Sequence, residues 1–105
     1  MSYYYLEVVR GSEVGRRYCL ADGATSVGRS SQNTLALHSA EKSVSGHHAI
    51  IYKSGDRISL QDLESTNGTF VNEEKTGERE LAAGDIVGFG KAGPRLRLIA
   101  SDKEL

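Results

Sequence analysis

Two short polar stretches of the sequence carry side chains that suit a doubly charged oxyanion. Gly28-Arg29-Ser30 places an arginine beside a glycine that allows the backbone to turn. The arginine side chain offers a planar fork of donors that matches phosphate. Ser45-Gly46-His47-His48 adds a hydroxyl and two imidazoles. Alone, the first stretch is typical of a turn with a solvated arginine, and the second can be a turn whose serine satisfies its own backbone.

A third polar stretch, residues 65–72, contains Thr66-Asn67-Gly68. Asn67-Gly68 predicts a tight turn, because both residue types tolerate positive φ. Thr66 supplies a hydroxyl and a backbone N–H, and Asn67 supplies two amide donors and one carbonyl acceptor. Such an amide matches the main chain of an extended peptide. A plain hairpin turn is the alternative interpretation of this stretch.

The rest of the sequence predicts many short strands. Apolar residues come in brief alternating runs separated by glycine and polar residues, and no window shows the helical period of 3.6 residues. Residues 73–83 are predicted to be a loop with a short strand near Leu81. We therefore expect an all-β fold, a two-sheet β-sandwich of about ten to eleven short, mostly antiparallel strands. The polar loops at 29–33, 38–47 and 64–69 should meet at one end of it.

Length and composition limit the classes of protein that fit. The chain has 105 residues, which suits a single domain over 1–105, with a core at about 4–100 and a short C-terminal tail at 101–105. The net charge of −1 lacks the basic excess of a nucleic-acid-binding protein. No apolar run approaches the roughly 18 residues of a membrane helix, and the first residues do not form a signal peptide.

Cys19 is the one cysteine of the chain, so no disulfide can form within it. This favours a reducing compartment and hence a cytoplasmic, intracellular location. We expect Cys19 to be a small buried apolar side chain rather than a reactive thiol.

The three stretches, in this order and spacing, resemble the forkhead-associated (FHA) domain family. Asp62-Leu63 before the third stretch and Gly84-Asp85-x-Val87 after it fit the same pattern. The resemblance covers about residues 4–100. It implies an FHA/SMAD-like β-sandwich of about eleven strands that binds phosphothreonine peptides in extended form across loops at one end.

The resemblance also implies roles for single residues. Arg29 resembles the arginine that contacts the phosphate, Ser45 and Thr66 resemble its hydroxyl partners, and Asn67 resembles the asparagine that holds the peptide main chain. Gly46 and His47 belong to the same binding set. The residues implied to shape the site are Gly28, Ser30, His48 and Gly68.

This assignment makes the chain a module for protein–protein interaction in Ser/Thr kinase signalling rather than an enzyme. The expected partners are a phosphothreonine-containing protein or peptide, and a Ser/Thr kinase or its substrates. No cofactor, metal, nucleic acid or membrane is expected, and the domain is expected to be monomeric.

The sequence departs from the family pattern at Gly46, where Arg, Asn or Lys is common. Glycine supplies only a backbone N–H there, and His47 is the candidate to replace the missing contact. The small Ser43 stands two residues before Ser45, at a position often involved in peptide choice.

Three other interpretations use the same residues. The fold could bind a partner without phosphate, through a sheet face. A hydrolase could use Ser45, His48 and Asp62, although the sequence has no nucleophile elbow. A zinc site could draw on His38, His47 and His48, although neighbours on a strand point to opposite faces and no cysteine pair is present.

Overall fold

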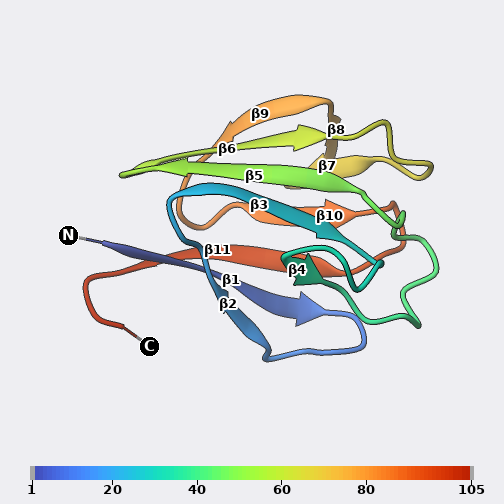
Figure 1. Ribbon diagram of the computed structural model, residues 1–105, viewed down its shortest axis with the longest axis horizontal. Coiled ribbons are helices and arrows are strands. Elements are labelled where there is room, and N and C mark those ends of the chain that lie inside the picture. The colour runs from blue at the N-terminus through green and yellow to red at the C-terminus, as the bar shows by residue number, and fades with distance from the viewer. Residues whose placement is uncertain (1, 105) are drawn as a thin grey trace.

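The computed structural model describes residues 2–104, which form two β-sheets facing each other (Figure 1). The six-stranded sheet has the order β2 (Arg17–Cys19), β1 (Tyr3–Arg10), β11 (Arg95–Ser101), β10 (Ile86–Phe89), β7 (Thr69–Val71) and β8 (Glu74–Thr76). The five-stranded sheet has the order β4 (Leu35–Ala36), β3 (Gly23–Gly28), β5 (Ala49–Ser54), β6 (Arg57–Asp62) and β9 (Glu78–Leu81).

Antiparallel pairing dominates both sheets and confirms the predicted all-β sandwich. Among the strand pairs of residues 2–104, one is parallel and joins β3 to β4. The first and last strands, β1 and β11, lie side by side, with Leu6 opposite Leu98. Residues 2–104 contain no helix with the length and apolarity required to cross a membrane.

The core lies between the sheets and is formed by the inward-facing side chains of alternating strand residues. Both sheets contribute to it, so the two layers depend on one shared set of apolar contacts. The most deeply buried of the core side chains are Leu6, Val27, Leu35, Val44, Ala49, Ile51, Ile58, Leu60, Val71, Val87, Phe89, Leu96 and Leu98.

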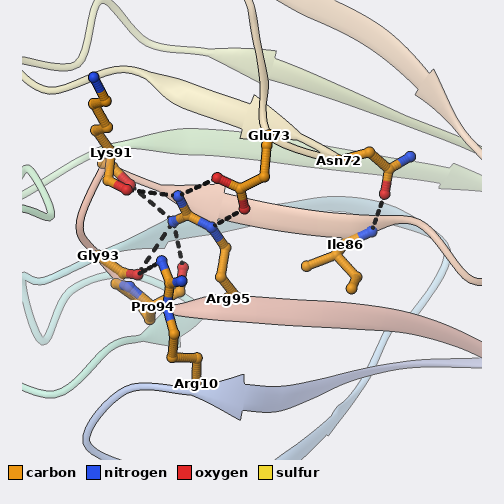
Figure 2. A network of polar contacts seen from close by, with 9 residues as sticks. Arg10, Asn72, Glu73, Ile86, Lys91, Gly93, Pro94 and Arg95 are labelled. Carbon is orange, nitrogen blue, oxygen red and sulfur yellow. Dashed lines mark hydrogen bonds and ion pairs between the residues drawn. The ribbon is translucent and has the colours of Figure 1, made fainter.

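Residues 73–83 contain two strands, β8 and β9, where the sequence predicted one short strand in a loop. The β7–β8 hairpin turns at Asn72 and Glu73, whose φ angles are 51° and 67°. Such a turn normally carries glycine, and its absence hid the hairpin. Contacts from neighbouring strands hold it instead. The Asn72 Oδ1 accepts a hydrogen bond from the Ile86 N–H at 3.0 Å, and Glu73 binds Arg95 (Figure 2).

Cys19 is exposed, so the prediction that it is buried was wrong. It lies at the end of the edge strand β2 opposite Tyr5. Tyr18 packs against the core and Leu20 is buried within it, so strand alternation turns the residue between them outward.

The Arg95 side chain ties the β10–β11 loop to the β7–β8 turn (Figure 2). It is 3% exposed, and its Nε and Nη2 donate to the two Glu73 carboxylate oxygens at 2.7 and 3.1 Å. The Arg95 hydrogen bonds and charge hold the pKa of Glu73 below its ordinary value. The remaining donors bind the carbonyl oxygens of Gly90, Lys91, Gly93 and Pro94.

Gly88 makes room for this guanidinium. A Cβ at Gly88 would lie 2.3 Å from Arg95 Nη1 and 2.4 Å from its Cζ. We expect Gly88→Ala to lower the free energy of unfolding by about 1–3 kcal/mol, because overfilling a packed site strains its neighbours. Urea denaturation measures this change. Gly77→Ala is the control, since a Cβ there meets nothing within 4 Å. Equal stability of the two variants would contradict the expectation.

Candidate functional site

The connections that carry the three polar stretches gather at the end of the sandwich opposite the chain termini (Figure 1). The first two stretches run side by side there. The Arg29 N–H donates to the Ser45 carbonyl at 3.0 Å, and the Ser30 N–H donates to the Gly46 carbonyl at 3.1 Å. A Cβ at Gly28 would lie 2.2 Å from the Gly46 oxygen, so only glycine allows this approach.

Asn33 locks the same two loops together and was missed in the sequence. It is buried, and its Nδ2 donates to the Gly46 carbonyl at 2.6 Å and to the Ser30 carbonyl at 2.9 Å. Its Oδ1 lies 3.2 Å from Nδ1 of the exposed His47. In the sequence, Asn33 is marked only as a polar residue two positions before the apolar Leu35. That pattern is too common to identify a structural residue.

The third stretch joins the second through two further hydrogen bonds. The Thr66 N–H donates to Ser45 Oγ at 3.0 Å, and Asn67 Nδ2 donates to the Ser43 carbonyl at 3.0 Å. Because Ser45 Oγ accepts this bond, its own O–H remains available as a donor. Main-chain and side-chain bonds therefore bring Arg29, Ser45, Thr66 and Asn67 to one surface.

The Arg29 guanidinium makes no ion pair or hydrogen bond with any residue of 2–104, and Arg29 is only half-buried. Gly46 is also open, since a Cβ there would meet nothing within 4 Å. The exposed Thr66 hydroxyl completes a set of donors turned toward solvent. An arginine, two hydroxyls and a free backbone N–H suit a phosphate group.

His48 lies beneath this surface and connects the second loop to the third. It is 0% exposed, and its ring meets Phe89 edge-on with centroids 5.3 Å apart. Its Nδ1 accepts from the Ser45 N–H at 3.0 Å, so the proton of the neutral ring lies on Nε2, which donates to the Gly68 carbonyl at 2.8 Å. Burial lowers the pKa of His48, and the Gly68 carbonyl and Asp62 offset only part of that.

Asp62 holds the Thr66-Asn67-Gly68 turn from its base. Its carboxylate accepts from the Ser65 hydroxyl, the Ser65 N–H and the Thr69 hydroxyl. Burial raises the pKa of Asp62, but these donors outweigh it and the net shift is downward. Of Asn67 and Gly68 only Gly68 has positive φ, at 86°, so the turn is not the doubly left-handed type that the pair suggested.

The β10–β11 loop completes the support. The Gly90 N–H donates to the Gly68 carbonyl at 2.8 Å, so that oxygen also receives a bond from the loop that Arg95 organises. A Cβ at Gly93 would lie 2.6 Å from Ser43 Oγ, which shows how closely this loop packs against Ser43. The surface around Asn67 is thus braced from both sheets.

The geometry does not suit the hydrolase interpretation. Both His48 nitrogens bind backbone groups, and Ser45 Oγ accepts from Thr66 rather than pairing with the imidazole. Within residues 2–104, no three His, Cys, Asp or Glu side chains gather as a metal site. His47 and His48 do lie on opposite sides, one exposed and one buried.

Protonation of His48 at low pH should lower the free energy of unfolding. Because its pKa is lower in the folded protein than in the unfolded chain, stability is complete above about pH 6.5 and falls as the pH drops toward the folded value. We expect the free energy of unfolding, measured in urea without ligand, to decrease between about pH 7.5 and about pH 5.5.

The carboxylates with shifted pKa values titrate below this window, since their pKa values are lowered. His48→Gln should remove the decline of the free energy of unfolding with falling pH, although the variant is less stable at neutral pH. His47→Gln, which changes an exposed imidazole, should keep the decline. An unchanged slope in His48→Gln would contradict the assignment.

Comparison with known proteins places this site in a family. The chain is 34% identical over 99 residues to the oxoglutarate dehydrogenase inhibitor of Corynebacterium jeikeium, which covers 94% of this chain and 66% of that protein. It is 37% identical over 86 residues to the glycogen accumulation regulator GarA of Mycolicibacterium smegmatis, covering 82% of this chain and 53% of that protein. The chain thus spans about half to two thirds of the length of these relatives.

A solved structure from an analysis of phosphothreonine-dependent FHA domain interactions superposes with a TM-score of 0.84. It is 32% identical in sequence, and the match covers 96% of this chain and 99% of that one. The sequence model of the FHA domain family matches residues 25–90, a range that includes all three polar stretches. The chain therefore belongs to the FHA domain family.

Proposed function

We propose that this chain binds phosphothreonine peptides and so mediates protein–protein contacts in Ser/Thr kinase signalling. The observation that carries the proposal is the convergence of Arg29, Ser45 and Thr66, fixed by hydrogen bonds between three separate loops. The relative of TM-score 0.84, described as phosphothreonine-dependent in its interactions, supports the choice of ligand.

Each residue has a physical role in this proposal. The Arg29 guanidinium and the Ser45 and Thr66 hydroxyls donate to the phosphate, which carries about −1.5 to −2 charges and three acceptor oxygens. The backbone N–H of Gly46 adds a donor beside them, and His47 lies next to it. Asn67 has one amide proton engaged by Ser43, which leaves its second proton and its carbonyl oxygen for the peptide main chain.

The energies fit a reversible contact. Hydrogen bonds to charged groups contribute about 1.5–3 kcal/mol each, so three or four amount to roughly 5–10 kcal/mol. Ordering a flexible peptide removes part of this gain. The expected affinity is therefore close to micromolar, or about −8 kcal/mol.

The wider setting follows from the same proposal. Partners are a phosphothreonine-containing protein, and a Ser/Thr kinase or its substrates, inside the cell where such kinases act. The region 1–105 serves as one monomeric binding unit, and the chemistry is recognition rather than catalysis.

Removing Arg29 tests the proposal directly. We expect Arg29→Ala to weaken phosphothreonine peptide binding at least about tenfold, because one charge-assisted contact of about 1.5–3 kcal/mol disappears. Calorimetric titration with phosphothreonine, phosphoserine and unmodified peptides measures it. Because the threonine methyl group is buried, phosphothreonine peptides should bind about fourfold more tightly than matched phosphoserine peptides. Equal binding of phosphorylated and unmodified peptides would refute the proposal in favour of a phosphate-independent module.

A side chain added at Gly28 should weaken phosphopeptide binding, whereas an arginine added at Gly46 should strengthen it. Gly28→Ala forces a Cβ against the Gly46 carbonyl, so we expect binding to fall at least about tenfold. Gly46→Arg enters open space with ordinary backbone angles and adds a second cation at the phosphate. We expect it to tighten binding about three- to tenfold.

Gly46→Ala is the control for the second variant, since it adds a Cβ without a charge. A Gly46→Arg protein that is folded but binds no more tightly than Gly46→Ala would show that the phosphate does not lie beside residue 46. Fluorescence anisotropy with one labelled phosphothreonine peptide compares all three variants.

A further inference from the structure

Lys75 reaches from β8 to the turn that holds Asn67. It pairs with Phe70 across the β7–β8 hairpin. A Cβ placed on Gly68 would lie 3.0 Å from Lys75 Cε and 3.6 Å from its Cδ, so the lysine stem lies directly over Gly68. The exposed ammonium group is therefore at the edge of the proposed peptide surface.

The acidic neighbours of Lys75 on the hairpin are already neutralised. Glu73 binds Arg95 and Glu74 binds Arg79, the second pair at 3.3 Å. Within residues 2–104, no carboxylate forms an ion pair with the Lys75 ammonium. Its charge is left available to a ligand.

Lys91 adds a second ammonium, in the β10–β11 loop that contacts Gly68. It follows Gly90, whose N–H binds the Gly68 carbonyl, and its own carbonyl accepts from Arg95 Nη2 at 2.7 Å. The backbone is thus fixed, while the exposed side chain extends away from the guanidinium (Figure 2). In the described part of the chain Lys91 also has no ion pair.

The contacts between loops give an order across this end of the sandwich. Arg29 and Ser45 lie on the five-stranded side, Thr66 and Asn67 follow, and Gly68 with the two lysines lies on the six-stranded side. An extended peptide advances about 3.3 Å per residue. Residues two to four positions from a phosphothreonine, in the direction that crosses Asn67, would therefore lie beside the Lys75 stem that covers Gly68.

We propose that Lys75 and Lys91 select phosphothreonine peptides that carry acidic residues on the flank crossing Asn67. This inference rests on the proposed function, because it assumes that the phosphate occupies the Arg29 end. The partner class is then a phosphorylated segment with one or more Asp or Glu on one side of the threonine, and lysine on that flank is disfavoured.

The test is a set of phosphothreonine peptides with Glu, Ala or Lys placed singly at each of the four positions on either side. Lys75→Met and Lys91→Met remove charge but keep an apolar stem. Lys103→Met is the matched control, since Lys103 follows β11 at the strand end away from Arg95. Dissociation constants are measured at roughly 0.05 M and roughly 0.5 M salt, where screening is weak and strong.

We expect peptides with Glu to bind about two- to fivefold more tightly than peptides with Ala, and only when the Glu lies on one flank. This is the size of effect that an exposed charge pair gives. The preference should shrink at high salt and in Lys75→Met and Lys91→Met, but persist in Lys103→Met. Phosphate-dependent binding with equal affinity for all flanks overturns this inference and leaves the proposed function standing. A flank preference unchanged in both lysine variants also overturns it. Failure to bind any phosphothreonine peptide overturns the proposed function itself.

Discussion

The site depends on one neutral imidazole enclosed in the sandwich. His48 accepts from the Ser45 N–H with one nitrogen and donates to the Gly68 carbonyl with the other, so its ring sets the distance between two loops that are remote in sequence. Because both nitrogens are used in opposite senses, only one protonation state and one tautomer fit. Phe89 and the core fix the ring itself, which links core packing to loop position.

The distribution of charge shows how a slightly acidic chain can present a cationic surface. The net charge is −1, yet Arg95 and Arg79 pair with Glu73 and Glu74 of the β7–β8 hairpin, while Arg29 and Lys75 form no ion pair within residues 2–104. Arg95 uses its donors on Glu73 and on loop carbonyls and is therefore structural. Arg29 makes no such contact with a described residue, which suits it for a ligand. Overall charge would have hidden this division of roles.

The three polar stretches and the two-sheet fold could be predicted because each depends on local patterns: glycine turns, alternating apolar residues and donor types. The missed features depend on contacts between distant segments. Glu73 occupies a left-handed turn position, and its carboxylate is bound by Arg95 from another hairpin. Asn33 acts through the Gly46 carbonyl, thirteen residues away. Cys19 was different, since alternation with Tyr18 already indicated that it faces outward and general burial statistics misled the prediction.

The pairing of β1 with β11 affects how the chain can fold. In the smaller sheet β5 and β6 are neighbours in sequence and in space, joined by a short turn between Ser54 and Arg57, and β3 pairs with β5 across residues 29–48. The larger sheet joins strands from the two extremes of the described chain, with Tyr3 opposite Ser101, and closing so long a loop costs more entropy. Topologies rich in such distant pairs fold in milliseconds to seconds. During synthesis on the ribosome, one edge of β1 therefore waits unpaired until β11 emerges, and that interval is when the chain is most open to chaperones or to misassembly.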